Sequence, residues 1–400
     1  MRVILAASGG GSVQTMTQDC QLALRNAGCI IGASRLLEEL SEEYTQNRVP
    51  ATAPQMVLQG IRSAKAETCV VLYSGDTGFY SGARALIPLL EKEGISYQVL
   101  PGLSSVQLLA AALERPWQDW LLLSAHGKKC DPVGAVMQGK PVFFLTGGEL
   151  GAAELCCRLV EAGLGTLPVV VGENLSYPQQ RIDRGTAEMF ADKSFAPLSV
   201  LLAEPAPTLA PRTAGFPDTF FIRGEIPMTK QEVRAAVLAK LAPKASDILW
   251  DVGAGTGSVS VELALAARWG RTYAVECREA ACQLIGQNRE KLGAWNLRLV
   301  KGTAPQALDG LETPDAVFIG GTNGAMKDVV ELVLRRNPKA RICISAICVE
   351  TLYEAVQSLQ NQGIQPEVTQ ISVSRSKAVG PLHMLVANNP IFLIAGNCDG

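Results

Sequence analysis

Short apolar runs alternate with longer stretches rich in alanine and leucine along most of the chain. The runs have the length and composition of buried β-strands. A stretch such as 82–94 (GARALIPLLEKEG) has the apolar spacing of an amphipathic helix. Strands that alternate with helices predict α/β layers with largely parallel sheets. The clearest runs in the first half are 69–75, 95–102, 119–127, 140–148 and 166–175.

This alternation breaks after residue 204. The stretch 205–227 holds five prolines and no periodic apolar face, which is typical of a linker. A helix is predicted to follow, with Thr229 as its N-cap and Glu232 three residues on, the spacing of a capping box. We therefore predict a domain over 1–204, a linker over 205–226 and a second domain over 227–400.

The second half contains the strongest local motif, DILWDVGAGTGSVSVELALAA over 247–267. A strand ends at Asp251, glycines follow at 253, 255 and 257, and a helix begins. Glycines let the backbone turn tightly and approach a ligand, and the helix start offers free N–H groups. A second strand ends at Glu276, where a carboxylate can accept hydrogen bonds from ribose hydroxyls. Three further strands and a terminal hairpin predict a Rossmann-like domain.

Two nucleotide ligands fit this layout, NAD and S-adenosylmethionine (SAM), and a purely structural glycine turn is a third interpretation. Asp251 stands two residues before the first glycine, where an anion would repel a pyrophosphate but suits a sulfonium and an amino group. The glycines also follow G-x-G-x-G rather than G-x-G-x-x-G. Both features favour SAM.

Composition narrows the class of protein further. The formal net charge is −2 and no long basic run occurs, which disfavours a nucleic-acid partner. Several of the eleven cysteines lie in apolar runs, as expected of a reduced, cytoplasmic protein. With no C-x-x-C pair and only two histidines, no metal site is expected. The N-terminal apolar run is too short for a membrane span, so no membrane partner is expected.

The motifs carry a resemblance to known methyltransferases over nearly the whole chain. The first 205 residues resemble the tetrapyrrole methylase (class III) family, whose fold has two α/β subdomains. The segment FIRGEIPMTKQEVRA (221–235), followed by LWDVGAGTGSVSVE, resembles the class I decarboxylating methyltransferases of cobalamin biosynthesis. In this order the halves resemble the family of fused precorrin-6Y C(5,15)-methyltransferases (decarboxylating). The N-terminal motifs are YSGDTGFYSGA (73–83), LPGLSSVQ (100–107), SAHGK (124–128), TGG (146–148), VGENLSYPQQRI (171–182) and APLSVLL (196–202).

The resemblance implies methylation of a precorrin-6B or cobalt-precorrin-6B type substrate at carbons 5 and 15, with loss of the ring C acetate carboxyl group. Carbon 5 is assigned to the first half, and carbon 15 with decarboxylation to the second. The resemblance also implies a homo-oligomer and two SAM sites. The first SAM site would use Gly75, Asp76, Ser104, Ser105 and Gly172. The second would use Thr229, Asp251, Gly253, Ala254, Gly255, Thr256, Gly257, Glu276 and Ala304.

One departure concerns the first glycine loop. Class III enzymes have a G-x-G-P-G loop after the first strand, whereas this chain has AASGGGS over 6–12, and Thr77 replaces a common proline. An alternative therefore stays open, in which only the second site is catalytic and the first half presents substrate.

The many carboxylates of such a substrate predict cationic side chains in its cleft. Arg223, Lys230 and His126 are the candidates. The alternative for Arg223 and Lys230 is that they belong to a solvated charged face, and the alternative for His126 is a structural role in its loop.

Overall fold

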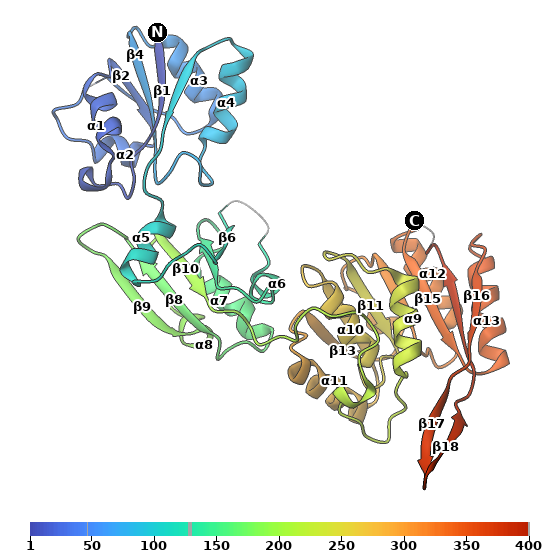
Figure 1. The fold of residues 1–400 in the computed structure, drawn as a ribbon. Helices are drawn as coiled ribbons and strands as arrows, with labels where there is room; N and C mark the ends of the chain where they lie inside the picture. Colours follow the sequence, from blue (N-terminus) through green and yellow to red (C-terminus); the bar gives the residue numbers. More distant parts are fainter. Residues whose placement is uncertain (46, 127–129, 399–400) are drawn as a thin grey trace. The chain divides into compact units, whose positions relative to one another are not determined.

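The computed structural model describes residues 1–45, 47–126 and 130–398, which form two compact units (Figure 1). The first unit comprises Met1–Cys130, Lys140–Val160 and Gly165–Glu204. The second comprises Asp131–Gly139, Glu161–Leu164 and Pro205–Gly400. Gly127 and Lys128 of the SAHGK motif lie outside the described residues.

The first unit opens with a five-stranded sheet in which all neighbouring strands are parallel. In sheet order its strands are β3 (Arg48–Pro50), β2 (Cys29–Gly32), β4 (Thr68–Tyr73), β1 (Arg2–Ala7) and β5 (Tyr97–Leu100). Its helices are α1 (Gln18–Arg25), α2 (Ser34–Glu38), α3 (Pro54–Ser63) and α4 (Ala83–Lys92). Along β1, Ile4 packs with α1 and α2 while Leu5 packs with α3 and α4. Because both faces are covered, the strands read as continuous apolar runs.

A second sheet of the first unit has mixed strand directions, which corrects the expectation of largely parallel sheets. Only the first two of its strands are parallel, and the other neighbouring pairs are antiparallel. Short connections allow antiparallel neighbours, whereas a parallel neighbour needs a long crossover. In sheet order the strands are β6 (Leu121–Ser124), β7 (Val142–Leu145), β10 (Ser199–Ala203), β8 (Pro168–Glu173) and β9 (Arg181–Thr186). The helices are α5 (Ser105–Ala112), α7 (Ala152–Glu161) and α8 (Ala187–Phe190).

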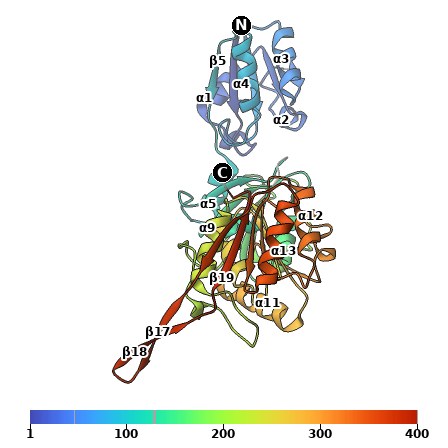
Figure 2. The same cartoon turned by 90° about the vertical axis from the view of Figure 1, so that its right-hand side faces the viewer.

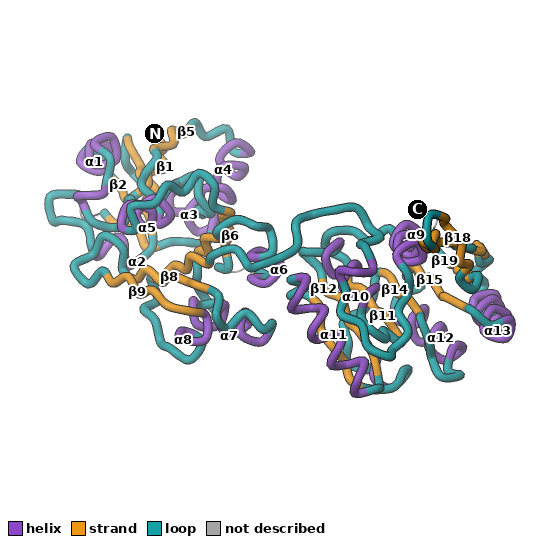
Figure 3. Tube along the Cα trace, turned by 60° about the horizontal axis from the view of Figure 1, so that its bottom comes forward, coloured by secondary structure: helices purple, strands orange, loops and turns teal. Residues whose placement is uncertain are grey.

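The second unit has a seven-stranded sheet, and Figure 3 shows helices flanking its strands. In sheet order the strands are β13 (Leu297–Lys301), β12 (Arg271–Glu276), β11 (Ile248–Val252), β14 (Ala316–Ile319), β15 (Arg341–Ala346), β19 (Ile391–Gly396) and β16 (Glu367–Ile371). The first five are parallel and β19 is antiparallel to both of its neighbours. The helices are α6 (Pro132–Val136), α9 (Gln231–Leu241), α10 (Ser258–Ala266), α11 (Glu279–Leu292), α12 (Met326–Arg336) and α13 (Val349–Gln360). The α/β fold class is confirmed.

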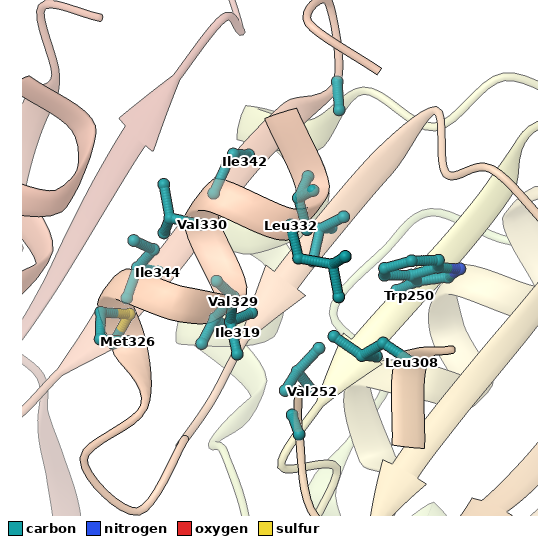
Figure 4. Close-up of a cluster of buried hydrophobic side chains, with 14 of the residues drawn as sticks. Trp250, Val252, Leu308, Ile319, Met326, Val329, Val330, Leu332, Ile342 and Ile344 are labelled. Atoms are coloured by element: carbon teal, nitrogen blue, oxygen red, sulfur yellow. The ribbon is translucent and has the colours of Figure 1, made fainter. Parts of the chain in front are cut away.

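One face of this sheet packs against α12 and α13. Figure 4 shows Val252, Ile319 and Ile342, from three strands, in one cluster with Val329 and Val330 of α12. Trp250 is a buried member of the same cluster, and its indole N–H donates to the Glu312 carbonyl at 3.2 Å. This cluster fixes the strands whose carboxyl ends carry the glycine motif.

The segment expected as a linker contains residues that are packed in the second unit. Phe216 and Phe221 are buried there. Near them the fully buried Arg234 forms ion pairs with Glu262 (2.7 Å) and Asp218 (3.0 Å). A buried guanidinium needs such partners, because an unpaired charge would be very costly. The domain boundaries stay a prediction.

The expected terminal hairpin contains an insertion. β16 and β19 do pair antiparallel, but a second hairpin, β17 (Ser374–Val379) and β18 (Leu382–Ala387), lies between them in sequence. Figure 2 shows it extending away from the sheet of the second unit. Apolar side chains are exposed on it, with Leu382 at 71% and Leu385 at 72%.

Candidate functional site

The glycine loop of the second unit joins β11 to α10. Gly253, Gly255 and Gly257 all have positive φ, between +57° and +75°. A side chain at Gly253 would overlap the backbone of Gly321, which follows β14. The loop therefore requires glycine for its conformation and for its close approach to the neighbouring strand.

Glu276 ends β12 beside this loop and is almost fully buried. Its carboxylate accepts hydrogen bonds at 2.9 Å from the backbone N–H groups of Gly255, Cys277 and Arg278. The Arg278 guanidinium lies 3.3 Å away. Burial raises the pKa of Glu276, but these donors outweigh burial and lower the pKa below its ordinary value. The carboxylate is therefore ionised at neutral pH.

A cavity of about 320 Å³ opens at the carboxyl ends of these strands. Three predicted residues line it: Gly253, Glu276 and Ala304. The predicted residues Ala254, Gly255, Thr256 and Gly257 belong to the same loop but do not line this cavity. The remaining lining comes from Val252, Val275, Cys277, Arg278, Gly302, Thr303, Gly320, Gly321, Thr322 and Asn323.

Asp251 lies at the end of β11, with no exposed surface, and does not line the cavity. One of its carboxylate oxygens accepts a hydrogen bond from the Ser260 hydroxyl, while Oδ1 has no partner among the described residues. Burial raises the pKa of Asp251 to about 7, although the Ser260 hydrogen bonds oppose the rise. This buried carboxyl group can therefore gain or lose a proton near neutral pH.

The segment before α9 differs from expectation at Thr229. Lys230, not Thr229, is the N-cap residue, and no side chain caps the helix from that position, so the predicted capping box is wrong. Asp218 instead accepts from the Gln231 backbone N–H at 3.0 Å. The Thr229 carbonyl accepts from the Arg234 guanidinium. Neither Thr229 nor Lys230 lines the cavity.

Asn288 of α11 connects that segment to the glycine loop, and sequence reasoning missed it. Its side-chain amide is fully buried, accepts from Ile222 N–H at 2.7 Å and donates to the Thr256 carbonyl at 2.9 Å. The neighbouring Arg223 is exposed and pairs with no described residue. A polar residue at an apolar position of α11 was the available signal for Asn288.

In the first unit, all six predicted residues line one cavity of about 280 Å³: Gly75, Asp76, Ser104, Ser105, Gly172 and His126. The Asp76 carboxylate accepts from the Gly78 N–H at 3.2 Å, so it also shapes the turn after β4. The Ser104 N–H donates to the Gln107 side chain at 2.8 Å at the start of α5. Residues from distant motifs thus meet at one cavity.

Arg35 and Tyr177 are among the polar residues of this cavity that sequence reasoning missed. The Arg35 guanidinium donates to the Tyr177 phenol oxygen at 2.8 Å, although 142 residues separate them. The tyrosine belongs to the VGENLSYPQQRI motif, but nothing in the sequence indicates that it faces the start of α2.

Three observations concern other chemistry. Among the residues that the structure describes, no three histidine, cysteine or acidic side chains form a group that could hold a metal ion. No disulfide bond joins the cysteines of the described residues. No described helix has the length and apolar character needed to cross a membrane.

Comparison with known proteins gives matches in both halves. The family model for tetrapyrrole (corrin/porphyrin) methylases matches residues 2–191, and the model for the precorrin methyltransferase domain matches residues 219–396. A precorrin-6Y C(5,15)-methyltransferase (decarboxylating) from Sinorhizobium sp. is 30% identical, covering 93% of this chain and 90% of the relative. A probable cobalt-precorrin-6B C(15)-methyltransferase (decarboxylating) from Pyrobaculum calidifontis is 41% identical, covering 46% of this chain and 95% of the relative. A solved precorrin-6Y C5,15-methyltransferase from Geobacter metallireducens is 35% identical, with a TM-score of 0.44 and coverage of 46% of this chain and 97% of its own.

Proposed function

Because the chain belongs to the family of decarboxylating precorrin-6Y C(5,15)-methyltransferases, we propose that it methylates a corrin precursor at carbons 5 and 15 and removes the ring C acetate carboxyl group. The methyl donor is SAM, and the substrate is of the precorrin-6B or cobalt-precorrin-6B type. The observation that carries the proposal is the sequence similarity to this family, which covers 93% of the chain and so includes both of its halves.

The second unit would hold SAM at the carboxyl ends of β11 and β12. The ionised Glu276 suits the ribose hydroxyls, and the loop from Gly253 to Gly257 gives the backbone close access to the ligand. Asp251 precedes that loop, its carboxyl group becomes anionic as the pH rises through its pKa of about 7, and its unpartnered oxygen suits a cationic ligand. Bound SAM supplies an electrophilic methyl group on a sulfonium sulfur.

The first unit would hold a second SAM in the cavity lined by Gly75, Asp76, Ser104, Ser105 and Gly172. The motifs that line it belong to the half that matches the tetrapyrrole methylases. His126 also lines this cavity and is available to the substrate, while Arg223 and Lys230 are proposed for the second site. We propose a first domain over 1–204, a linker over 205–226 and a second domain over 227–400.

The substrate supplies the remaining chemistry. A meso carbon of a reduced tetrapyrrole is enamine-like and would provide the electron pair of the new C–C bond, while the bond between the methyl group and sulfur breaks and its electron pair stays on sulfur. Methylation leaves the macrocycle cationic, and this cation accepts the electrons of the acetate C–C bond when carbon dioxide leaves. The protein then contributes mainly proximity and orientation, effects worth up to about 7–11 kcal/mol in favourable systems.

The proposal also includes a homo-oligomer, a cytoplasmic location and no nucleic-acid or membrane partner. The lack of disulfide bonds among the described residues supports the location, and the net charge of −2 supports the lack of nucleic-acid binding. The exposed Leu382 and Leu385 of the β17–β18 hairpin support self-association, because large exposed apolar patches mark interaction surfaces. Light scattering of Leu385→Lys against wild type tests this, and a monomeric wild-type chain would refute it.

Mass spectrometry of the product formed from precorrin-6B and SAM tests the main proposal. Two methyl groups gained and one carboxyl group lost are expected. One methyl group gained with decarboxylation would favour the alternative in which the first half only presents substrate.

A further inference from the structure

The cavity of the first unit contains one cationic residue among its described lining residues, Arg35. Its anionic counterpart in the lining is Asp76, and none of the other described lining residues is an arginine, lysine, aspartate or glutamate. A substrate that carries many carboxylates needs at least one cation for orientation in such a cavity. The candidates that the sequence suggested, Arg223 and Lys230, belong to the second unit.

The guanidinium of Arg35 is held from one side only. Its Nη1 donates to both carboxylate oxygens of Glu39, at 3.0 and 3.2 Å, and to the Tyr177 phenol oxygen at 2.8 Å. The phenol in turn donates to Glu39 at 3.0 Å. Nε and Nη2 donate to no described residue. These two nitrogens are therefore free to bind a carboxylate in a bidentate manner, which is the geometry that arginine favours.

Tyr177 is fixed by the glycine loop that departs from the family pattern. A side chain at Gly11 would overlap the Tyr177 phenol, and one at Gly10 would overlap the Ser176 hydroxyl. The Ser176 hydroxyl also donates to the Gly10 carbonyl at 3.0 Å. The loop around Tyr177 therefore packs against the glycines of residues 6–12. This packing positions the Tyr177 phenol, which is the hydrogen-bond partner of Arg35.

We propose that Arg35 is a positioning residue that binds a carboxylate of the tetrapyrrole substrate in the cavity of the first unit, with Tyr177 and Glu39 fixing its guanidinium. The proposal rests on the proposed function, since the substrate class comes from it. The methionine carboxylate of SAM has the same chemistry, so the test must separate these two sources of a carboxylate.

The test measures carbon-5 methylation of a substrate already methylated at carbon 15, together with SAM binding by calorimetry. Arg35→Met should raise the KM for the tetrapyrrole roughly ten- to hundredfold, as expected from loss of one charge-assisted hydrogen-bonding partner. The kcat at saturating substrate and the SAM Kd should stay near wild type. Arg35→Lys should recover part of the loss, and Tyr177→Phe should give a smaller rise in KM.

Arg62→Met is the matched control, because Arg62 forms an ion pair with Glu93 at 2.5 Å on the same unit but does not line the cavity. It should leave the KM unchanged. An unchanged KM in Arg35→Met would overturn the proposal, as would a weaker SAM Kd with an unchanged KM, since the latter assigns the residue to SAM. If the wild-type chain does not methylate carbon 5, the proposed function fails. Tetrapyrrole binding, measured by absorbance titration, then tests the role of Arg35. Weaker binding by Arg35→Met than by the wild-type chain would support the proposal, and equal binding would overturn it.

Discussion

Replacing Glu276 with alanine removes the carboxylate that is proposed to bind the ribose in the second unit. Three backbone N–H groups at 2.9 Å keep this carboxylate ionised and aimed at the cavity. A hydrogen bond to a charged group contributes roughly 1.5–3 kcal/mol. The expected result is therefore about a ten- to hundredfold loss of SAM affinity at this site. Carbon-15 methylation and decarboxylation should fall together, because the second step depends on the cation that the first one creates.

Titration calorimetry with SAM measures this loss directly. The wild-type chain should show two binding events, and the variant should retain the one in the first unit. Glu279→Ala is the matched control, because Glu279 lies on the neighbouring helix in an exposed ion pair with Lys301, which contributes little. A variant that remains folded and binds two SAM molecules with wild-type affinity would refute the role of Glu276.

Four further outcomes are expected. SAM affinity of the second unit should rise from about pH 6 to about pH 8 as Asp251, with a pKa of about 7, becomes anionic, and Asp251→Asn should abolish this rise in calorimetry. Because the folded pKa of Asp251 is raised, its contribution to stability is fully present below the unfolded pKa and is lost as the pH rises through about 7, which urea unfolding at several pH values would show. Gly253→Ala should destabilise the second unit by about 1–3 kcal/mol in urea unfolding, because its side chain meets backbone at positive φ, whereas Gly286→Ala in an open helical position should stabilise it slightly. Arg234→Met should cost about 3–5 kcal/mol, because it leaves the buried Glu262 carboxylate without its cationic partner and Asp218 with Arg375 alone. Lys327→Met in a surface pair should cost almost nothing, and equal unfolding midpoints for the two variants would contradict this.

Local patterns predicted the elements of the fold better than their pairing. The run at 69–75 is found as β4 (Thr68–Tyr73), and the helix expected over 82–94 is α4 (Ala83–Lys92). The direction of the strands in the second sheet of the first unit was not predictable, because it depends on which distant strands become neighbours. The β17–β18 hairpin was also missed, since its exposed apolar residues have the pattern of a buried strand.

The candidate sites show the same division between local and distant signals. The glycines and Glu276 belong to local motifs, so the sequence indicated them as candidate SAM-binding residues. The pairing of Arg35 with Tyr177 and the bridging amide of Asn288 depend on contacts between distant segments, which no local motif encodes. The Thr229 cap was wrong because Asp218, from outside the local motif, accepts the N–H of the first turn.

If one chain carries two methylating sites, isotopic labelling will show two methyl transfers to each substrate molecule. Precorrin-6B is incubated with the wild-type chain and SAM labelled in its methyl group, and the product is measured by mass spectrometry. The expected product carries two labelled methyl groups and one carboxyl group fewer than the substrate. A final product that carries a single labelled methyl group after complete conversion would contradict the presence of two methylating sites.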